Sequence, residues 1–329
     1  MSWQRHHPAD IPRSEWLNWL SGVAEPSPYL LPEWGVFWER VWPHGRAEVW
    51  IKKNAAGECE AALPLVRRRR LGLEMCYAQP MGTPSGPIIA PGTNQDDLDV
   101  NGAWHAIIGA RTVEFVPSPD WMGVSVDGWT RREVVSTAWM LDLPEPHGDD
   151  LPMRFSESHR RNIAHGRECY STITEVRSAE DVASILSLWK APVRPSRLVL
   201  NSYRARTLVD LFAPTGALRW RAAWTAGRPV AVVLFLVNRT QAVYIDGAFD
   251  RDRGVRGVGH CLFADTLTQL ARDGVRAVDL GGGPGGGRHG GLDRFKAGWG
   301  ARPISRMSAI YRRPLYHALR SVGRSFRMA

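Results

Sequence analysis

The sequence has few cysteines, and they lie far apart. Its four cysteines in 329 residues form no CxxC pair and have no histidine nearby at the spacing of metal ligands. They are Cys59, Cys76, Cys169 and Cys261. We therefore expect buried free thiols, because the spacing supports neither a zinc site nor a catalytic cysteine. The expected site contains no metal.

Long apolar runs are also missing. No uninterrupted stretch approaches the roughly 18 apolar residues of a membrane-spanning helix. The first residues, MSWQRHHPADIPRSEW, lack the apolar centre of a signal peptide. With 44% hydrophobic and 23% charged residues, the composition is typical of a soluble globular protein and argues against a disordered one. We expect a cytoplasmic protein.

Acidic residues are too few to balance the basic ones. The 42 lysines and arginines against 33 acidic residues give a net charge of +9. A strongly basic surface favours polyanionic partners such as nucleic acid, phosphorylated cofactors or anionic lipid. Many arginine-rich proteins are simply basic, so composition alone weighs these two interpretations equally.

The first half of the chain has the pattern of a mixed α/β domain. Ser14 is expected to cap a short helix over 15–23, and Pro32 stands at the first position of a second helix. The remaining expected elements are a helix over 97–110, a hairpin of strands 47–53 and 59–66, and strands at 111–118 and 132–143. The chain is long enough for a second domain of similar size.

A segment rich in proline, glycine and aspartate separates the two halves. It is DLPEPHGDDLP, residues 142–152, and we place the domain linker there. The expected organisation is an N-terminal domain over 1–148, a second domain over 149–311, and a basic C-terminal helix or tail over 312–329.

The second half repeats the pattern of the first. Its expected helices cover 156–168, 178–190 and 201–212, and its strands cover 171–176, 217–226, 229–238 and 241–249. Ser178 and Asp181 resemble a capping box. The turn glycines of the two hairpins, Gly57 and Gly227, lie 170 residues apart, and two helices precede each hairpin. This pattern indicates a duplicated α/β unit.

A loop that contains several glycines leads directly into a helix after the three strands expected over 217–249. Gly254, Gly257 and Gly259 lie in the loop, and the helix carries an apolar stripe of Phe263, Leu267 and Leu270. The start of such a helix offers unpaired N–H groups and the positive end of its dipole. We expect the phosphate group of a co-substrate, the donor of the reaction considered below, to bind here. The expected residues are Arg253, Arg256, Gly257, Val258 and Gly259. The spacing does not fit a Rossmann dinucleotide site, because no first βαβ strand precedes it.

A second glycine loop contains the strongest candidate for chemistry. DLGGGPGGGRHGGLDRFKAGWG, residues 279–300, has ten glycines in twenty-two residues and places Lys296 behind Phe295. Glycine loses the most backbone entropy on folding, so the run indicates a close approach or a mobile lid. Lys296 could neutralise a phosphate or stabilise an oxyanion formed during acyl transfer. For an isolated lysine, a solvated surface position would be the ordinary interpretation.

These motifs resemble the FemABX group of acyltransferases. The resemblance covers nearly the whole chain and is strongest over 253–303, where the glycine loop precedes GLDRFKAGWGARP; AALPLV, GTPSGP and SHRRNIAHGRE agree with it. It implies two GNAT-like α/β domains, each a mixed, mainly antiparallel sheet flanked by helices, with clefts facing a shared groove. It also implies transfer of an amino acid from aminoacyl-tRNA to an amine, on a cell-wall precursor or, in antibiotic biosynthesis, on small peptides or nucleosides. Phe295 and Lys296 would then border the reaction centre.

Two positions depart from the pattern of such proteins. GNAT proteins that bind coenzyme A usually have Gln or Arg where this sequence has Gly254, which puts pyrophosphate binding by the usual loop in doubt. Peptidoglycan-type members carry a lysine after an early tryptophan, whereas here Arg40 is the nearest cation to Trp38. A nucleotide-muramoyl acceptor is therefore disfavoured.

Further candidates could line the acceptor pocket or assist the reaction. Tyr244 and Asp246 share one face of a strand, so Asp246 could orient or deprotonate the amine, although a structural hydrogen bond is the favoured interpretation. The expected acceptor-pocket residues are Trp34, Trp38, Arg160, Arg161, Tyr244, Gly282, Gly283 and His289. Arg160 and Arg161 could instead form a solvated helix face, and His289 could be either a proton shuttle or an exposed loop residue.

The C-terminal tail is basic and amphipathic. Leu315, Leu319 and Val322 recur at helical spacing with arginines between them. The tail could dock on the protein, bind tRNA phosphates, or make a peripheral contact with anionic lipid.

The sequence thus predicts a cytoplasmic aminoacyltransferase. Its co-substrate would be aminoacyl-tRNA, its acceptor a small-molecule amine, and it would need no bound cofactor and no DNA. Two alternatives stay open: an acyl-CoA-dependent N-acyltransferase on the same scaffold, and a non-catalytic protein that binds RNA or anionic lipid.

Overall fold

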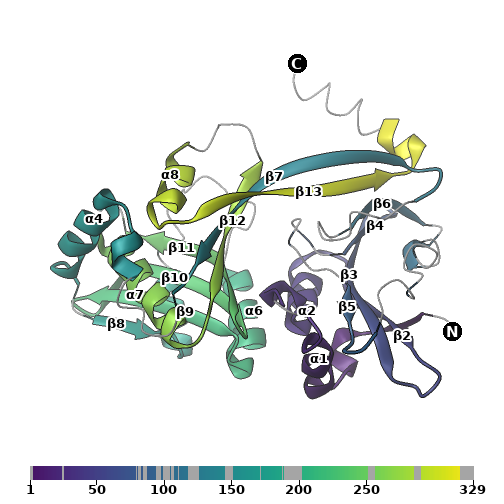
Figure 1. Cartoon of the computed structure of the whole chain (residues 1–329), viewed down its shortest axis with the longest axis horizontal. Coiled ribbons are helices and arrows are strands. Elements are labelled where there is room, and N and C mark those ends of the chain that lie inside the picture. The colour runs from purple at the N-terminus through teal and green to yellow at the C-terminus, as the bar shows by residue number, and fades with distance from the viewer. Residues whose placement is uncertain are drawn as a thin grey trace. The chain divides into compact units, whose positions relative to one another are not determined.

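The structure is a computed structural model of the chain (Figure 1). It describes residues 3–23, 26–78, 80, 83, 87–93, 98, 104, 107–109, 111–117, 126–144, 151–170, 172–186, 188, 202–250, 256–284 and 290–318. None of the helices in these ranges is long and apolar enough to cross a membrane.

The chain forms two compact units that do not follow the expected linker. The first unit comprises residues 1–136 and 306–329, and the second comprises 137–305. The expected domains, 1–148, 149–311 and 312–329, differ from these units because the chain passes between units inside two strands. Composition marks the irregular segment near 142–152, whereas sheet pairing determines which residues pack together.

The first unit has a sheet in the order β1-β2-β3-β4-β6-β13, with the short β5 paired to β3. Its strands are β1 (Gln4–His6), β2 (Gly45–Lys53), β3 (Cys59–Arg70), β4 (Leu73–Tyr77), β5 (Ile88–Ile89) and β6 (Thr112–Val116), and its helices are α1 (Arg13–Leu20) and α2 (Pro32–Val41). The core is aromatic, and Trp16, Trp34, Phe37 and Trp38 are at most 1% exposed.

The second unit has a sheet in the order β7-β12-β11-β10-β9-β8. Its elements are α4 (Glu157–Arg167), β8 (Thr172–Glu175), α5 (Ala179–Ile185), α6 (Ser202–Phe212), β9 (Leu218–Thr225), β10 (Arg228–Asn238), β11 (Gln241–Phe249), α7 (Val258–Arg272), β12 (Ala277–Pro284) and α8 (Gly290–Gly298). The apolar face of α7 packs on this sheet through Phe263, Leu267 and Leu270, as the spacing of the three residues predicts.

The predicted duplication is confirmed by the pairing of the strands. Each unit has two helices before an antiparallel hairpin, β2–β3 in the first unit and β9–β10 in the second. A third antiparallel strand then pairs in parallel with a fourth, as β4 with β6 and β11 with β12. Gly57 and Gly227 both adopt positive φ, 83° and 72°, which the hairpin turns require.

One strand of each sheet is exchanged between the two halves of the chain. β7 (Thr130–Asp142) follows β6 in the chain, yet its later residues belong to the second unit, next to β12. β13 (Arg302–Arg312) follows the second unit, yet its later residues return to the first, where Tyr311 pairs with Phe115 of β6. Figure 1 shows both as long strands. Each unit is therefore completed by a strand from the other half of the sequence.

Some local predictions are confirmed and others are wrong. Helix α2 begins at Pro32, and the capping box of Ser178 and Asp181 is present at the start of α5. Helix α1 instead begins at Arg13, so Ser14 lies inside the helix and does not cap it. Among the four free cysteines, Cys76 and Cys261 are buried, whereas Cys59 and Cys169 are only half-buried. Most of the helix expected over 97–110 lies outside the described residues.

Candidate functional site

Two neighbouring parallel strands of the second unit separate soon after they begin. β11 and β12 pair at three positions, the last joining Val243 to Asp279. β11 then continues to Phe249 and β12 to Pro284, while a bulge opposite Leu234 and Phe235 skips Ile245 in the register. Beyond the last pair, the facing edges of the two strands have no pairing register with each other, so backbone donors and acceptors face the gap between them.

Two glycines of β12 are required by the backbone, one by a close approach and one by its positive φ. A Cβ atom on Gly282 would lie 1.6 Å from the carbonyl oxygen of Thr137 in β7. Gly281 has φ of +70°, and its N–H donates to Asp279 Oδ1 at 2.7 Å. At these two positions the glycine run therefore serves a fixed local structure, since a side chain would either clash or strain the backbone.

Lys296 is buried in the second unit. The residue lies in α8 and is 5% exposed. Its Nζ donates a hydrogen bond to the Gly281 carbonyl at 2.8 Å. Burial lowers the pKa of Lys296, while the nearby charges of Asp279 and Asp293 act in the opposite direction. Trp139 Nε1 in turn donates to Asp293 Oδ1 at 3.2 Å. The interpretation of Lys296 as a solvated surface lysine is therefore wrong.

Helix α8 is fixed by a histidine that the sequence analysis did not single out. His159 of α4 donates from Nε2 to the Phe295 carbonyl at 3.0 Å. Because a carbonyl can only accept, Nδ1 of the neutral ring accepts from the Ser156 hydroxyl, also at 3.0 Å. The ring leaves no room beside Gly298, where a Cβ would lie 2.1 Å from His159 Cε1. The backbone on both sides of Lys296 is thus positioned by one imidazole.

An aromatic cluster surrounds this histidine. His159 meets Trp299 edge-on at 4.5 Å between ring centroids and lies 4.9 Å from His260. Phe295 and Phe263 also contact Trp299, and Phe263 contacts Tyr244 at 5.3 Å. The cluster joins α4, α7, α8 and β11, so it connects the start of α7 with the residue before Lys296.

The start of α7 has the features expected of an anion site. Gly257 precedes the helix with φ of +87°, and no side chain caps the first turn. A Cβ on Gly257 would lie 2.1 Å from the Asn162 carbonyl, so α4 and α7 meet backbone to backbone. Gly259 faces open space, Val258 is buried, and Arg256 is exposed. Arg253 lies outside the described residues.

The structure brings several other predicted residues near this site. Tyr244 and Asp246 lie on β11 where it leaves β12, and burial together with the charge of Asp246 raises the pKa of Tyr244. Asp246 Oδ1 accepts from the N–H of Gly247 at 2.8 Å. Arg160 and Arg161 are exposed on α4, and Arg160 donates to the Met153 carbonyl. Gly283 belongs to β12, and His289 lies outside the described residues.

Trp34 and Trp38 do not join this group of residues. They belong to the first unit and are 0% and 1% exposed. They lie at i and i+4 of α2, with Phe37 and Val41 completing the buried stripe. Neither indole has a free face for an acceptor in this structure, so their expected place in an acceptor pocket is replaced by a place in the core.

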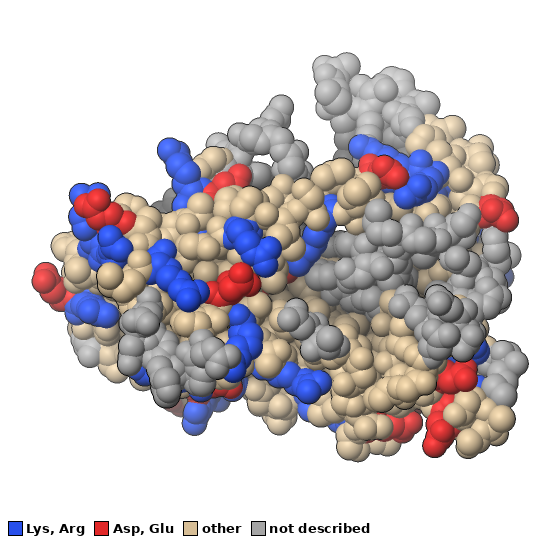
Figure 2. Space-filling view, viewed as in Figure 1, with Lys and Arg blue, Asp and Glu red and all other residues tan. Residues whose placement is uncertain are grey.

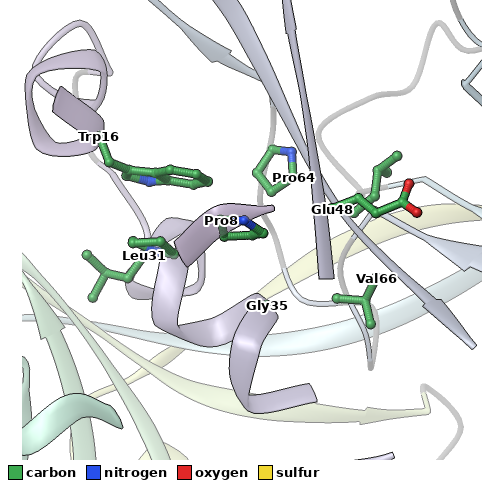
Figure 3. Close-up of a pocket in the computed structure, with 9 residues that line it drawn as sticks. Pro8, Trp16, Leu31, Gly35, Glu48, Pro64 and Val66 are labelled. Carbon is green, nitrogen blue, oxygen red and sulfur yellow. The ribbon is translucent and has the colours of Figure 1, made fainter. Parts of the chain in front are cut away.

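A small cavity near α2 does not restore such a pocket. It is lined by Pro8, Trp16, Leu31, Gly35, Glu48, Pro64 and Val66, with Pro32 and Leu65 completing the wall (Figure 3). Its volume of about 10 Å³ is at the lower limit for one water molecule. An amine substrate does not fit there.

Two histidines, the buried His159 and the half-buried His260, predict acid sensitivity of this region. Burial and the neighbouring His159 lower the pKa of His260 from 6.5 to about 4, and burial also lowers the pKa of His159. Below pH 6.5 the unfolded chain binds protons that the folded chain excludes. The free energy of unfolding should therefore fall between pH 6.5 and pH 4, by roughly 2–3 kcal/mol from His260.

Urea unfolding at a series of pH values measures this effect. His260→Phe keeps the ring volume and removes the titrating group, so its stability should fall less than that of the unmodified chain over the same range. An equal fall in both proteins would contradict the assignment.

Comparison with known proteins agrees with this geometry. Residues 153–297 match the family model described as an acetyltransferase (GNAT) domain. Among curated proteins, no relative was found by sequence. The structure of FemX is similar with a TM-score of 0.71 and 13% identity, over 96% of this chain and 99% of that one.

Two further structures have the same fold. The C-terminal domain of a putative lysylphosphatidylglycerol synthetase from Agrobacterium fabrum matches with a TM-score of 0.57 and 16% identity, over 94% of this chain and 93% of that one. A tandem GNAT protein from the clavulanic acid biosynthesis pathway matches with 0.56 and 15%, over 94% and 97%. At identities of 13–16%, these similarities show a shared fold. The predicted FemABX-like architecture is confirmed for the fold: residues 153–297 match a GNAT domain, and the whole chain is similar in fold to FemX and to a tandem GNAT protein.

Proposed function

We propose that the protein is an aminoacyltransferase that moves an amino acid from aminoacyl-tRNA to an amine. The observation that carries this proposal is Lys296, a buried cation bound to the Gly281 carbonyl just beyond the point where β11 and β12 separate. A cation in a site of low dielectric stabilises negative charge more strongly than one in water.

The proposed reaction exchanges an ester for an amide. The amine nitrogen of the acceptor attacks the carbonyl carbon of the aminoacyl ester, and the C–N bond forms through a tetrahedral oxyanion. The C–O bond to the ribose then breaks, and the proton lost by the amine passes to the leaving hydroxyl. Since the ester is already activated, positioning and oxyanion stabilisation supply most of the rate enhancement.

Each candidate residue has a role in this scheme. Lys296 Nζ would donate to the oxyanion or to a donor phosphate, and Phe295 would border the reacting carbonyl. Asp246, on the edge of β11 that leaves β12, would orient the amine or accept its proton. The first turn of α7, with Arg256, would bind the donor phosphate.

An acyl-CoA donor is the second candidate, and a specific observation favours it. The separated edges of β11 and β12 offer the backbone groups to which an extended pantetheine arm could pair. Gly254, where GNAT proteins that bind coenzyme A usually have Gln or Arg, argues against this donor. It lies outside the described residues.

The donor is tested with two labelled pools. Total tRNA charged with radiolabelled amino acids is incubated with the protein and a pool of small amines, while labelled acetyl-CoA is incubated in parallel. We expect label to leave tRNA for one amino acid and to appear in an amide that survives mild alkali. Consumption of acetyl-CoA alone would replace the proposed donor with acyl-CoA, and binding of RNA without turnover of either donor would favour the non-catalytic alternative.

A further inference from the structure

The turn between β3 and β4 carries an exposed leucine in a strained conformation. Leu71 is 92% exposed and has φ of +51°, followed by Gly72 with φ of +77°. Residues with a Cβ seldom adopt positive φ, and asparagine, aspartate or glycine are the usual choices in such a turn. Neither burial nor backbone preference therefore explains a leucine here.

A second hairpin turn of the same chain shows that the geometry does not need a leucine. In the β9–β10 turn, Ala226 and Gly227 have φ of 48° and 72°, nearly the same values. Ala226 is also exposed, but its side chain is a single methyl group. The two turns thus differ mainly in the large apolar side chain that the β3–β4 turn presents to solvent.

Arginines lead up to this leucine. β3 ends in Arg67–Arg70, and its last pairs with β4 join Arg69 to Glu74 and Arg70 to Leu73. Arg69 and Arg70 are exposed, and successive residues of a strand point to opposite faces. We call residues 68–73 the arginine hairpin. Leu73 is itself 39% exposed. The tip of the arginine hairpin is therefore apolar, and its two faces are basic.

The positive charge of the hairpin is not neutralised within the described part of the chain. Glu74 accepts from Arg67 at 2.8 Å and from the Thr112 hydroxyl at 2.8 Å, so its carboxylate is already engaged. No described carboxylate lies within ion-pair distance of Arg69 or Arg70. Over the face in Figure 2, basic side chains are interspersed with acidic ones.

We propose that the arginine hairpin is a docking surface for anionic membranes. Arg69 and Arg70 would contact lipid phosphates, and the side chains of Leu71 and Leu73 would enter the boundary between headgroups and acyl chains. A nucleic acid would satisfy the arginines but would leave Leu71 exposed, so the apolar tip favours a lipid surface over RNA. The proposal does not depend on the donor used by the second unit.

The test compares two variants of the full chain in sedimentation with vesicles of equal parts phosphatidylglycerol and phosphatidylcholine. Leu71→Asn suits the backbone better than leucine, so the variant should fold normally, yet vesicle binding should fall about tenfold. Arg69→Ser/Arg70→Ser should lower binding about 30-fold. The matched control is Ala226→Asn, which makes the same kind of change in the other turn and should leave binding unaltered.

Four results would overturn the proposal. The unmodified chain could fail to sediment with these vesicles, or it could bind equally to vesicles of phosphatidylcholine alone. Binding could also be unchanged in both hairpin variants, which would move the contact to the C-terminal tail. Finally, if the arginine variant lost affinity for total tRNA while Leu71→Asn kept full vesicle binding, the hairpin would be a nucleic-acid surface.

Discussion

Lys296→Met should lower the rate of acyl transfer by about two to three orders of magnitude while leaving the protein folded. Methionine has a similar length but carries no charge, so the variant loses every N–H donor that Nζ supplies to the site. Removal of one oxyanion donor from an enzyme typically has an effect of this size. The loss should appear in kcat more than in KM, because the oxyanion forms only on the way to the transition state.

The same variant also removes the hydrogen bond to Gly281, so its effect on stability must be measured separately from its effect on the rate. Urea unfolding measures the effect on stability directly. We expect the free energy of unfolding to fall by about 1–3 kcal/mol, because the buried Gly281 carbonyl loses its donor. Lys52→Met is the matched control, since Lys52 lies in the first unit, paired with Glu60 at 3.4 Å. If Lys296→Met unfolded the chain, or if both variants lost activity equally, a catalytic role for Lys296 would not be supported.

Gly282→Ala should destabilise the protein by about 3 kcal/mol or more. The new methyl group would meet the carbonyl oxygen of Thr137 at 1.6 Å, its carbonyl carbon at 2.6 Å and Ala138 Cα at 3.0 Å. All three are backbone atoms of β7, so no rotation of a side chain relieves the contact. The strand would have to leave its place beside β12.

Gly290→Ala is the natural comparison for this substitution. Gly290 lies in the same glycine-rich segment, at the start of α8, and has nothing within 4 Å of an added Cβ. It should be neutral or stabilising, because alanine favours helix. Urea unfolding and soluble yield of the two variants check the prediction, which fails if both glycines tolerate alanine equally well.

Local patterns predicted much of this fold because they act over short stretches of chain. The hairpins around Gly57 and Gly227, the proline at the start of α2 and the stripe on α7 all follow from neighbouring residues. The duplication could be seen for the same reason, since each hairpin follows the same order of helices. The pair Phe295 and Lys296 was found because its glycine-rich setting is unusual.

Contacts between distant residues could not be predicted in this way. His159 of α4 and Phe295 of α8 are 136 residues apart in the chain and meet only in the folded structure, so nothing in SHRRNIAHGRE marks that histidine. Trp34 and Trp38 show the opposite difficulty, since an aromatic stripe on a helix suits a pocket and a core equally. Their burial was decided by the neighbouring strands.

The exchanged strands also determine when each half of the protein can finish folding. A ribosome releases the first 136 residues long before it reaches β13, so the nascent sheet waits with the edge of β6 unpaired. An unpaired edge is a template for the wrong partner, including another nascent chain on the same message. Loss of β13 through a premature stop codon would therefore damage the first unit, although most of that unit is synthesised before the second.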